Sequence, residues 1–174
     1  MRIFVIADTH FNHQMLIDKG YRPKGYDQFI WNDLINLPND CLLIHLGDIC
    51  IGNDLDVHNK LKRLSYKKVL VKGNHDCKSN HWYLSHGWDF VCEQFQDTYF
   101  GKKVLFSHVP VRDSGFDFNI HGHFHVINRE DYNIEFASIL NYKHKLVSLE
   151  GLGYKPILLE RLLNNENIYF NKSI

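Results

Sequence analysis

Five short apolar runs constrain how this 174-residue chain can fold, because residues of the metal-ligand type follow each of them. The runs cover residues 2–7, 41–46, 68–72, 104–107 and 118–121. Nearly continuous apolar runs of this length are typical of strands that are buried on both faces of a sheet. In open α/β sheets, ligands bind outside the carboxyl ends of the strands. We therefore expect the polar residues after the runs to meet at one rim.

Two segments in which apolar residues have the spacing of a helix separate the first three runs. Apolar residues recur at this spacing over residues 27–37 and 55–64, which predicts a parallel sheet with covering helices. The second half predicts a short helix at 80–86, β-type runs at 89–92, 95–100, 102–107, 118–121 and 145–149, a hairpin turn at Gly101-Lys102, and a last helix at 157–163 with Pro156 at its start. Residues 167–170 are expected to form an edge strand or to be loose. One domain over residues 1–174 accounts for this length.

The polar residues after the runs are oxygen and imidazole donors without a thiolate. They are Asp8 and His10, then Asp48, then Asn74, then His108, and finally His123 and His125. This donor set suits Mn, Fe, Zn or Ni rather than a structural zinc site. Seven such groups are too many for one ion and fit two, with Asp48 as the shared carboxylate. Two ions about 3.5–4 Å apart activate a bridging hydroxide and stabilise displacement at phosphorus.

The turn Gly73-Asn74-His75-Asp76 directly follows the third run. Gly and Asn suit a turn because both tolerate positive φ angles, but a structural turn needs no ionisable residue. We therefore predict that Asn74 binds a metal and that His75 donates a proton. Asp76 is expected to have a structural role, in which it holds the turn or a neighbouring imidazole.

In this order, Asp8-x-His10, Gly47-Asp48, Gly73-Asn74-His75-Asp76, His108 and Gly122-His123-x-His125 resemble the five motifs of the calcineurin-like metallophosphoesterases. The resemblance covers residues 8–125, about two-thirds of the chain. It implies a two-layer β-sandwich flanked by helices, with a dinuclear metal centre on its rim. It also implies that Asp8, His10, Asp48 and His125 hold one ion, that Asp48, Asn74, His108 and His123 hold the other, and that His75 is the general acid. The short chain resembles a small, capless bacterial or phage-type branch of the family.

One departure from the family pattern limits the class of substrate that we expect. Larger protein phosphatases continue the Gly-Asp motif with an Asp-Arg pair, whereas Ile49-Cys50-Ile51-Gly52 follows Gly47-Asp48 here. A phosphoprotein phosphatase is therefore disfavoured, and the group that orients His75 stays open. Arg22, Arg112 and His13 are candidate substrate contacts, since they lie in polar loops expected near the rim. Each arginine is equally well explained as a solvated loop residue, and His13 as a residue behind the ligands.

Composition disfavours several other classes of function, although it does not exclude a polynucleotide substrate. The net charge is zero, so no overall field attracts nucleic acid or an anionic membrane. No apolar run approaches the roughly 20 residues of a membrane-spanning helix. The amino terminus is too short and too soon acidic for a signal peptide, and the four cysteines lack C-x-x-C spacing, so a cytoplasmic protein is expected.

The combined prediction is a metal-dependent phosphodiesterase that acts on small or nucleotide-type substrates. A diester leaves an alkoxide that needs a proton, and His75 supplies one. A phosphomonoesterase is the alternative, and a non-catalytic scaffold of the same fold is the third possibility, disfavoured because every motif residue is present. Mn²⁺ is the expected metal, with Fe, Zn or Ni as alternatives, and the oligomeric state is open.

Overall fold

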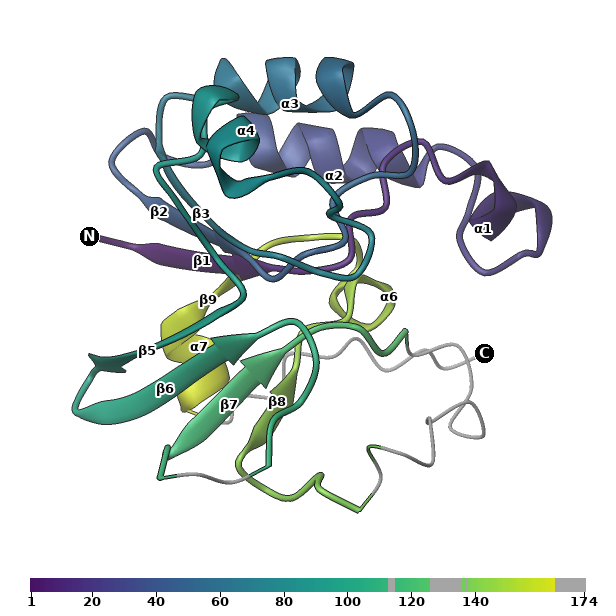
Figure 1. Ribbon diagram of the computed structural model, residues 1–174. Coiled ribbons are helices and arrows are strands. Elements are labelled where there is room, and N and C mark those ends of the chain that lie inside the picture. Colours follow the sequence, from purple (N-terminus) through teal and green to yellow (C-terminus); the bar gives the residue numbers. More distant parts are fainter. Residues whose placement is uncertain (113–114, 126–135, 137, 165–174) are drawn as a thin grey trace.

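Two β-sheets lie face to face in the computed structural model, which describes residues 1–112, 115–125, 136 and 138–164 (Figure 1). The first sheet has the strand order β4-β3-β2-β1-β9, and the second has the order β5-β6-β7-β8. The strands of the first sheet are β1 (Ile3–Ile6), β2 (Leu42–His45), β3 (Lys67–Val71), β4 (Phe90–Cys92) and β9 (Ile157–Leu158). Those of the second are β5 (Gln94–Tyr99), β6 (Lys102–Ser107), β7 (Phe118–His121) and β8 (His144–Leu146).

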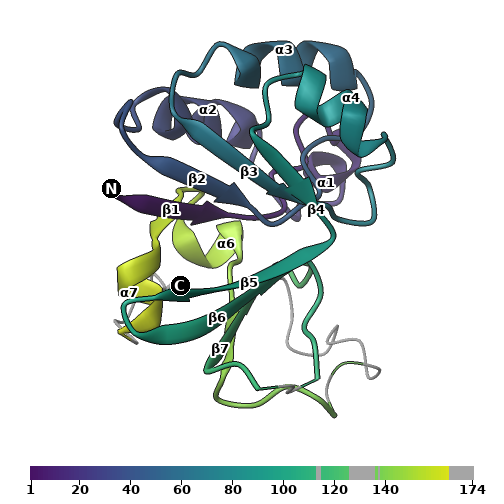
Figure 2. The same cartoon turned by 60° about the vertical axis from the view of Figure 1, so that its left-hand side comes forward.

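Four helices lie in the connections between the parallel strands of the first sheet, the longer ones on its outer face (Figure 1), and two later helices of the described chain pack at the edge of the core between the sheets. They are α1 (Gln14–Asp18), α2 (Tyr26–Ile35), α3 (Asp54–Lys62), α4 (Asn80–Ser85), α6 (Leu149–Leu152) and α7 (Leu159–Leu163). β1 to β4 are parallel, and β9 pairs with β1 in the antiparallel sense. The chain passes from the first sheet to the second between β4 and β5, at one edge of both (Figure 2). The predicted two-layer arrangement with flanking helices is therefore confirmed.

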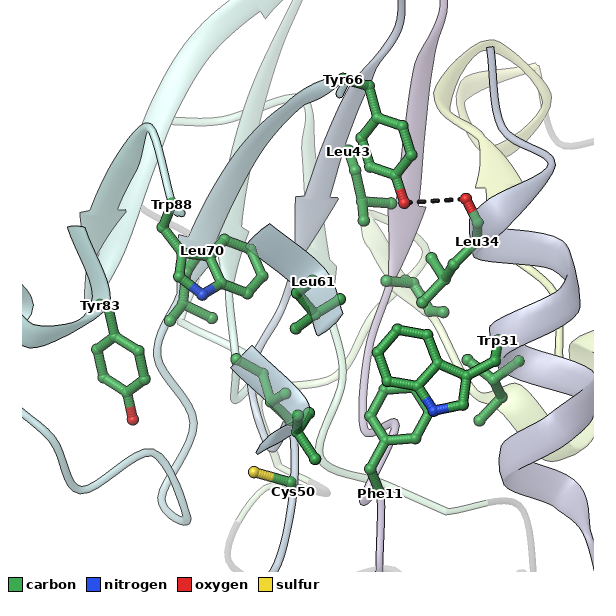
Figure 3. Packing of buried hydrophobic residues seen from close by; sticks show 14 of the residues in the cluster. Phe11, Trp31, Leu34, Leu43, Cys50, Leu61, Tyr66, Leu70, Tyr83 and Trp88 are labelled. Atoms are coloured by element: carbon green, nitrogen blue, oxygen red, sulfur yellow. Dashed lines mark hydrogen bonds between the residues drawn. The ribbon is translucent and has the colours of Figure 1, made fainter. Parts of the chain in front are cut away.

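Alternate residues of the central strands face two different hydrophobic cores, as the period of a β-strand requires. Ile6, Leu43 and Leu70 pack against the helices, and this core contains Trp31, Leu34 and Leu61 (Figure 3). The Tyr66 hydroxyl in the same core donates a 3.1 Å hydrogen bond to the Leu34 carbonyl (Figure 3). The strands are thus buried on both faces, which explains their nearly continuous apolar character.

The second core lies between the two sheets. Val5, Ile44 and Val71 from the first sheet meet Phe106 and Ile120 from the second, and all five are completely buried. Side chains of α6 and α7 complete this core at its edge. Because the sheets pack directly on each other, the carboxyl ends of β1, β2 and β3 lie beside those of β6 and β7.

Several local predictions need correction. The turn of the β5–β6 hairpin is Phe100-Gly101, both with positive φ, because a two-residue turn of this hand needs a left-handed backbone at both positions. α1 was not expected. Residues 157–158 form β9 instead of the first turn of a helix, and Leu149 begins α6 rather than ending a strand. The predicted edge strand at 167–170 lies outside the described residues.

None of the helices in the described part of the chain has the length and apolar character that spanning a membrane requires.

Candidate metal centre

The loops after β1 and β2 run side by side beyond the ends of their strands. The Asp8 amide donates to the Gly47 carbonyl at 2.9 Å, and the His10 amide donates to the Asp48 carbonyl at 3.0 Å. Parallel pairing thus continues past the sheet and places the side chains of both loops at the same rim. This is a backbone arrangement, and the side chains remain available for other partners.

Four of the predicted ligands have a left-handed backbone. The φ angles are 53° for Asp8, 44° for His10, 56° for Asp48 and 71° for His123. Non-glycine residues rarely adopt this conformation, which costs of the order of 1–3 kcal/mol each and is concentrated at functional sites. The strain is consistent with loops whose shape is set by the site that they form.

Two glycines are required because the ligand side chains approach their backbones closely. A Cβ atom on Gly73 would overlap Asp48 Oδ1, and one on Gly122 would overlap Asp8 Oδ2. The carboxylates themselves accept backbone hydrogen bonds from the same loops. Asp48 Oδ1 accepts from the His75 amide at 2.9 Å, and Asp8 Oδ2 accepts from the His123 amide at 2.9 Å. Each carboxylate is therefore held by one oxygen, and its second oxygen faces the centre of the site.

Among the described residues, three overlapping groups of side chains could hold an ion: two without His75, which we call group one and group two, and a third made of His10, Asp48 and His75. Group one consists of Asp8, His10 and His125, and group two of Asp48, His108 and His123. The ligand atoms within each group lie within 4.8 Å of one another. These groups contain six of the seven side chains predicted to bind metal.

The seventh predicted ligand, Asn74, lies beside group two. Its Oδ1 atom is 3.1 Å from His108 Nε2, which is also 3.1 Å from His123 Nδ1. The other nitrogen of the His108 ring donates to the Leu46 carbonyl at 2.7 Å, because a carbonyl only accepts. In the neutral ring, Nε2 therefore has a lone pair that points at the Asn74 oxygen. Two lone pairs that face each other repel, and a cation between the two atoms would stabilise the contact.

Asp48 lies between the groups. Its Oδ2 atom is 3.6 Å from His10 Nε2 in group one and 3.5 Å from His108 Nε2 in group two. A carboxylate in this position can serve ions in both groups, as the sequence predicts for a shared ligand. The individual ligand assignments stay predictions, but the structure brings all seven predicted ligands together.

Unpaired buried atoms show that a cation fits group one. Asp8 Oδ1 and both ring nitrogens of His10 are buried and lack a hydrogen-bond partner in the described structure. Polar atoms are rarely buried without a partner, because no hydrogen bond then offsets the free-energy cost of desolvation. Carboxylate oxygen and neutral imidazole are ligands of Mn, Fe, Zn and Ni. A divalent cation is the partner that this set of atoms fits.

Burial disfavours the charged forms of the His10 and Asp8 side chains in group one. Burial, together with the nearby Arg22 charge, holds the pKa of His10 far below its ordinary value, so the imidazole is neutral and has a lone pair. Burial raises the pKa of Asp8 to about 6, although the His108 and His125 charges oppose this. The cost of an ionised Asp8 is what a bound cation would remove.

His75 lies at the edge of both groups and faces solvent. Its side chain is 43% exposed, its Nε2 atom is 3.9 Å from Asp48 Oδ2, and its ring meets that of His10 edge-on at 5.4 Å. Asp76 does not orient it. The Asp76 carboxylate instead accepts hydrogen bonds from the backbone amides of Asp48, Ile49 and Gly73, which confirms its predicted role in the turn.

The positions of two of the three predicted substrate contacts, His13 and Arg112, do not contradict contact with a substrate. The His13 ring is 5.3 Å from the ring of His10 and 6.5 Å from that of His75, and it is half-buried. Arg112 is exposed on the loop after His108. Both stay predictions.

The third predicted substrate contact, Arg22, needs correction. Arg22 is buried, and its guanidinium donates to the Asp8 carbonyl at 2.8 Å, the Thr9 carbonyl at 3.0 Å and Glu150 Oε1 at 2.8 Å. These bonds occupy the guanidinium inside the protein, so it does not face the rim as a phosphate-binding loop residue would. The residue was misplaced because its surroundings in sequence are polar and resemble a solvated loop.

Sequence reasoning missed Glu150, which accepts a 3.0 Å hydrogen bond from His125 Nδ1. The hydrogen bond and the Asp8 charge raise the pKa of His125 above its ordinary value, although burial alone would lower it. Burial also opposes ionisation of Glu150, but His125 and Arg22 hold its pKa well below the usual range. One signal was present in the sequence, because Glu150 follows the β-type run at 145–149 just as the predicted ligands follow their runs.

The chain is similar to several known proteins. The protein MJ1445 of Methanocaldococcus jannaschii, described as uncharacterised, is 28% identical over 178 residues, which cover 93% of this chain and 89% of that protein. The solved structure of AQ665 from Aquifex aeolicus, described as a protein of unknown function, aligns with a TM-score of 0.74 and 28% identity over 94% of this chain and 98% of that one. A structure described as a novel archaeal phosphodiesterase aligns with a TM-score of 0.46 and 24% identity over 72% of this chain and 74% of that one, which is too distant to inform substrate choice.

The family model of the calcineurin-like phosphoesterases matches residues 1–166, a span that includes both groups, His75 and Glu150. Because the match covers nearly the whole sequence, the chain belongs to the calcineurin-like phosphoesterase family.

Proposed function

We propose that this protein is a metal-dependent phosphodiesterase with two divalent ions, which hydrolyses small or nucleotide-type diesters with His75 as the general acid. The observation that carries the proposal is the position of His75. Its ring is accessible to solvent and adjoins Asp48, the carboxylate between the two groups. A general acid must reach the leaving oxygen of a phosphate held at the two groups, and this edge position suits that task.

Group one and group two, together with Asn74, would hold the ions. When bound, divalent ions of the Mn type lower the pKa of water and offset the negative charge of the phosphate. The chain contributes the remaining parts. Buried backbone hydrogen bonds hold Asp8 and Asp48 in place, while Asn74 and His75 project from the short turn that Asp76 holds.

The leaving group of the substrate tests the proposed acid role of His75. A diester with an alkyl leaving group depends on protonation, whereas a nitrophenolate leaves without it. The substitution His75→Asn should therefore reduce turnover of alkyl diesters by a factor on the order of 10²–10⁴, but turnover of bis(p-nitrophenyl) phosphate much less. Steady-state kinetics with Mn²⁺ on both substrates measures this difference.

The matched control is His81→Asn, which changes an exposed histidine of α4. It should leave both activities and the metal content unchanged. An equal loss of activity on both diesters in His75→Asn, with metal retained, would contradict the acid role. Faster turnover of p-nitrophenyl phosphate than of any diester by the wild type would favour the phosphomonoesterase, for which the exposed Arg112 is the candidate phosphate contact.

A small phosphoester substrate, possibly a nucleotide, the absence of a membrane partner, the choice of Mn²⁺ and a cytoplasmic location stay predictions from the sequence. Elemental analysis of the protein as purified from its own cells would identify the metal.

A further inference from the structure

An internal ion pair lies directly behind group one. Arg22 and Glu150 are 128 residues apart in sequence, and their side chains are almost completely buried, at 0% and 8% exposure. Glu150 Oε2 accepts from the Ser148 hydroxyl at 2.9 Å, so both oxygens of the carboxylate are paired. A buried ion pair is weak evidence for stability, because desolvation offsets much of its attraction. Its contacts with group one suggest a second role.

The first contact, between Glu150 and His125, determines which ring nitrogen of His125 carries the proton. Its Nδ1 atom is 3.0 Å from Glu150 Oε1 and 3.3 Å from Arg22 Nη2. A carboxylate only accepts and a guanidinium only donates, so the two contacts require opposite states of Nδ1. The shorter distance and the charge of the carboxylate favour Nδ1–H donation to Glu150. The neutral ring then has its lone pair on Nε2, which becomes the nitrogen available to a cation in group one.

The second contact holds the backbone of the other ligands. Arg22 donates to the carbonyls of Asp8 and Thr9, and the Tyr26 hydroxyl donates to the carbonyl of His10. The guanidinium of Arg22 also lies 4.9 Å from the centre of the Tyr26 ring. The carbonyls of three successive residues in the strained loop after β1 are therefore bound by buried side chains. Arg22 connects this loop to Glu150, and Glu150 connects it to His125.

We infer that Glu150 is a positioning residue for group one. It selects the Nδ1–H tautomer of His125 and, through Arg22, holds the His125 ring in a fixed position relative to Asp8 and His10. The inference rests on the proposed function, because it concerns a group expected to bind metal. Partners behind a ligating histidine fix the orientation and tautomer of the ring, and their loss costs about 10–100-fold in metal affinity. A purely structural ion pair would not alter His125.

Two substitutions at Glu150 separate the roles. Glu150→Gln keeps an oxygen that can accept from both Arg22 and His125, whereas Glu150→Met keeps the length of the side chain without an acceptor. Glu160→Met makes the same change at an exposed position of α7 and is the matched control. Circular dichroism and thermal unfolding first establish that each metal-free variant is folded.

The first measurement is Mn²⁺ binding by isothermal titration calorimetry. Glu150→Gln and the control should bind like the wild type within a few-fold. Glu150→Met should bind one of two ions about 10–100-fold more weakly and leave the other unchanged. The inference is overturned if Glu150→Met binds both ions with wild-type affinity.

The second measurement is the tautomer of His125 in metal-free protein at pH 8.5, by ¹H–¹⁵N correlation of the ring nitrogens, with the signal assigned by its absence in His125→Gln. Nδ1–H is expected in the wild type and in Glu150→Gln, and a shift toward Nε2–H in Glu150→Met. If Glu150→Met does not fold, Arg22→Met/Glu150→Met removes both buried charges and should show the same shift. An unchanged tautomer in the folded variant also overturns the inference. If the wild type binds no Mn²⁺ but the tautomer shifts, the proposed function fails while the link from Glu150 to His125 stands.

Discussion

At the scale of single residues, the turn after β3 shows how closely the site is packed. Three backbone amides from two loops converge on the Asp76 carboxylate, and Asp48 Oδ1 lies against the α-carbon of Gly73. No side chain fits at residue 73 without moving Asp48 or the backbone. The glycine is therefore needed for space, in addition to any freedom that it gives the turn.

Gly73→Ala should abolish binding of at least one Mn²⁺ ion and lower the stability by about 1–3 kcal/mol, because the new methyl group displaces Asp48 from its position between the groups. Calorimetric titration with Mn²⁺ and thermal unfolding measure the two effects. Gly25→Ala is the control, since Gly25 has a φ of 82° but open space around it. It should cost about 1 kcal/mol from backbone strain and leave metal binding intact. Wild-type Mn²⁺ binding by Gly73→Ala would show that Asp48 can shift without consequence.

At the scale of elements, a buried histidine joins α3 to the segment that follows α4. Trp88 Nε1 donates a 3.0 Å hydrogen bond to His58 Nδ1, and the His58 ring packs against Trp82 and Tyr83. Nδ1 must be unprotonated to accept this bond. Burial accordingly lowers the pKa of His58 to about 4 from its ordinary value of 6.5.

Acid should weaken this contact between elements. Between pH 6.5 and about 4 the unfolded chain protonates His58 and the folded protein does not, so stability falls as the pH falls through this window, by up to about 3 kcal/mol. In His58→Asn, the amide oxygen can still accept from Trp88 but does not titrate. Urea unfolding at pH 7 and pH 4.5 should show a smaller loss of stability in His58→Asn than in the wild type or the surface variant His81→Asn. Equal losses in all three would exclude His58 as the cause.

At the scale of the whole molecule, both groups connect the two sheets. Group one takes Asp8 and His10 from the first sheet and His125 from the second, while group two takes Asp48 from the first and His108 and His123 from the second. Bound ions would therefore link the layers at their rim. A ligand that binds only the folded state also stabilises it by mass action.

Metal removal should lower the Tm. At free Mn²⁺ of about 100 times Kd, each site adds about 2.7 kcal/mol, which a chelator removes. Differential scanning calorimetry measures the shift, and hydrogen exchange should accelerate in residues 8–10, 46–49 and 122–125. Asp48→Asn, which alters the carboxylate between the groups, should show little response to Mn²⁺. A Tm that is independent of both Mn²⁺ and chelator would argue against metal in either group.

Much of the site could be predicted from the sequence because its ligands are local to strand ends. Asp8, Asp48 and His108 each follow a buried run within two residues, and in a parallel arrangement such positions meet. The nearly continuous apolar character of the strands also predicted burial on both faces, which the two cores confirm. The division into two sheets came from the resemblance to a family, since strand pairing between β4 and β3 or β9 and β1 leaves little trace in a single sequence.

The sequence by itself determined which residues stand at the carboxyl ends of the strands, because hydrophobic period and turn chemistry act between near neighbours in the chain. The tertiary structure alone decided what lies behind them. Arg22 appeared to belong to a polar loop and Glu150 was not singled out, yet the two side chains form a buried ion pair across 128 residues. The burial of a charge depends on a partner, and chain folding, rather than local pattern, determines which partner it meets.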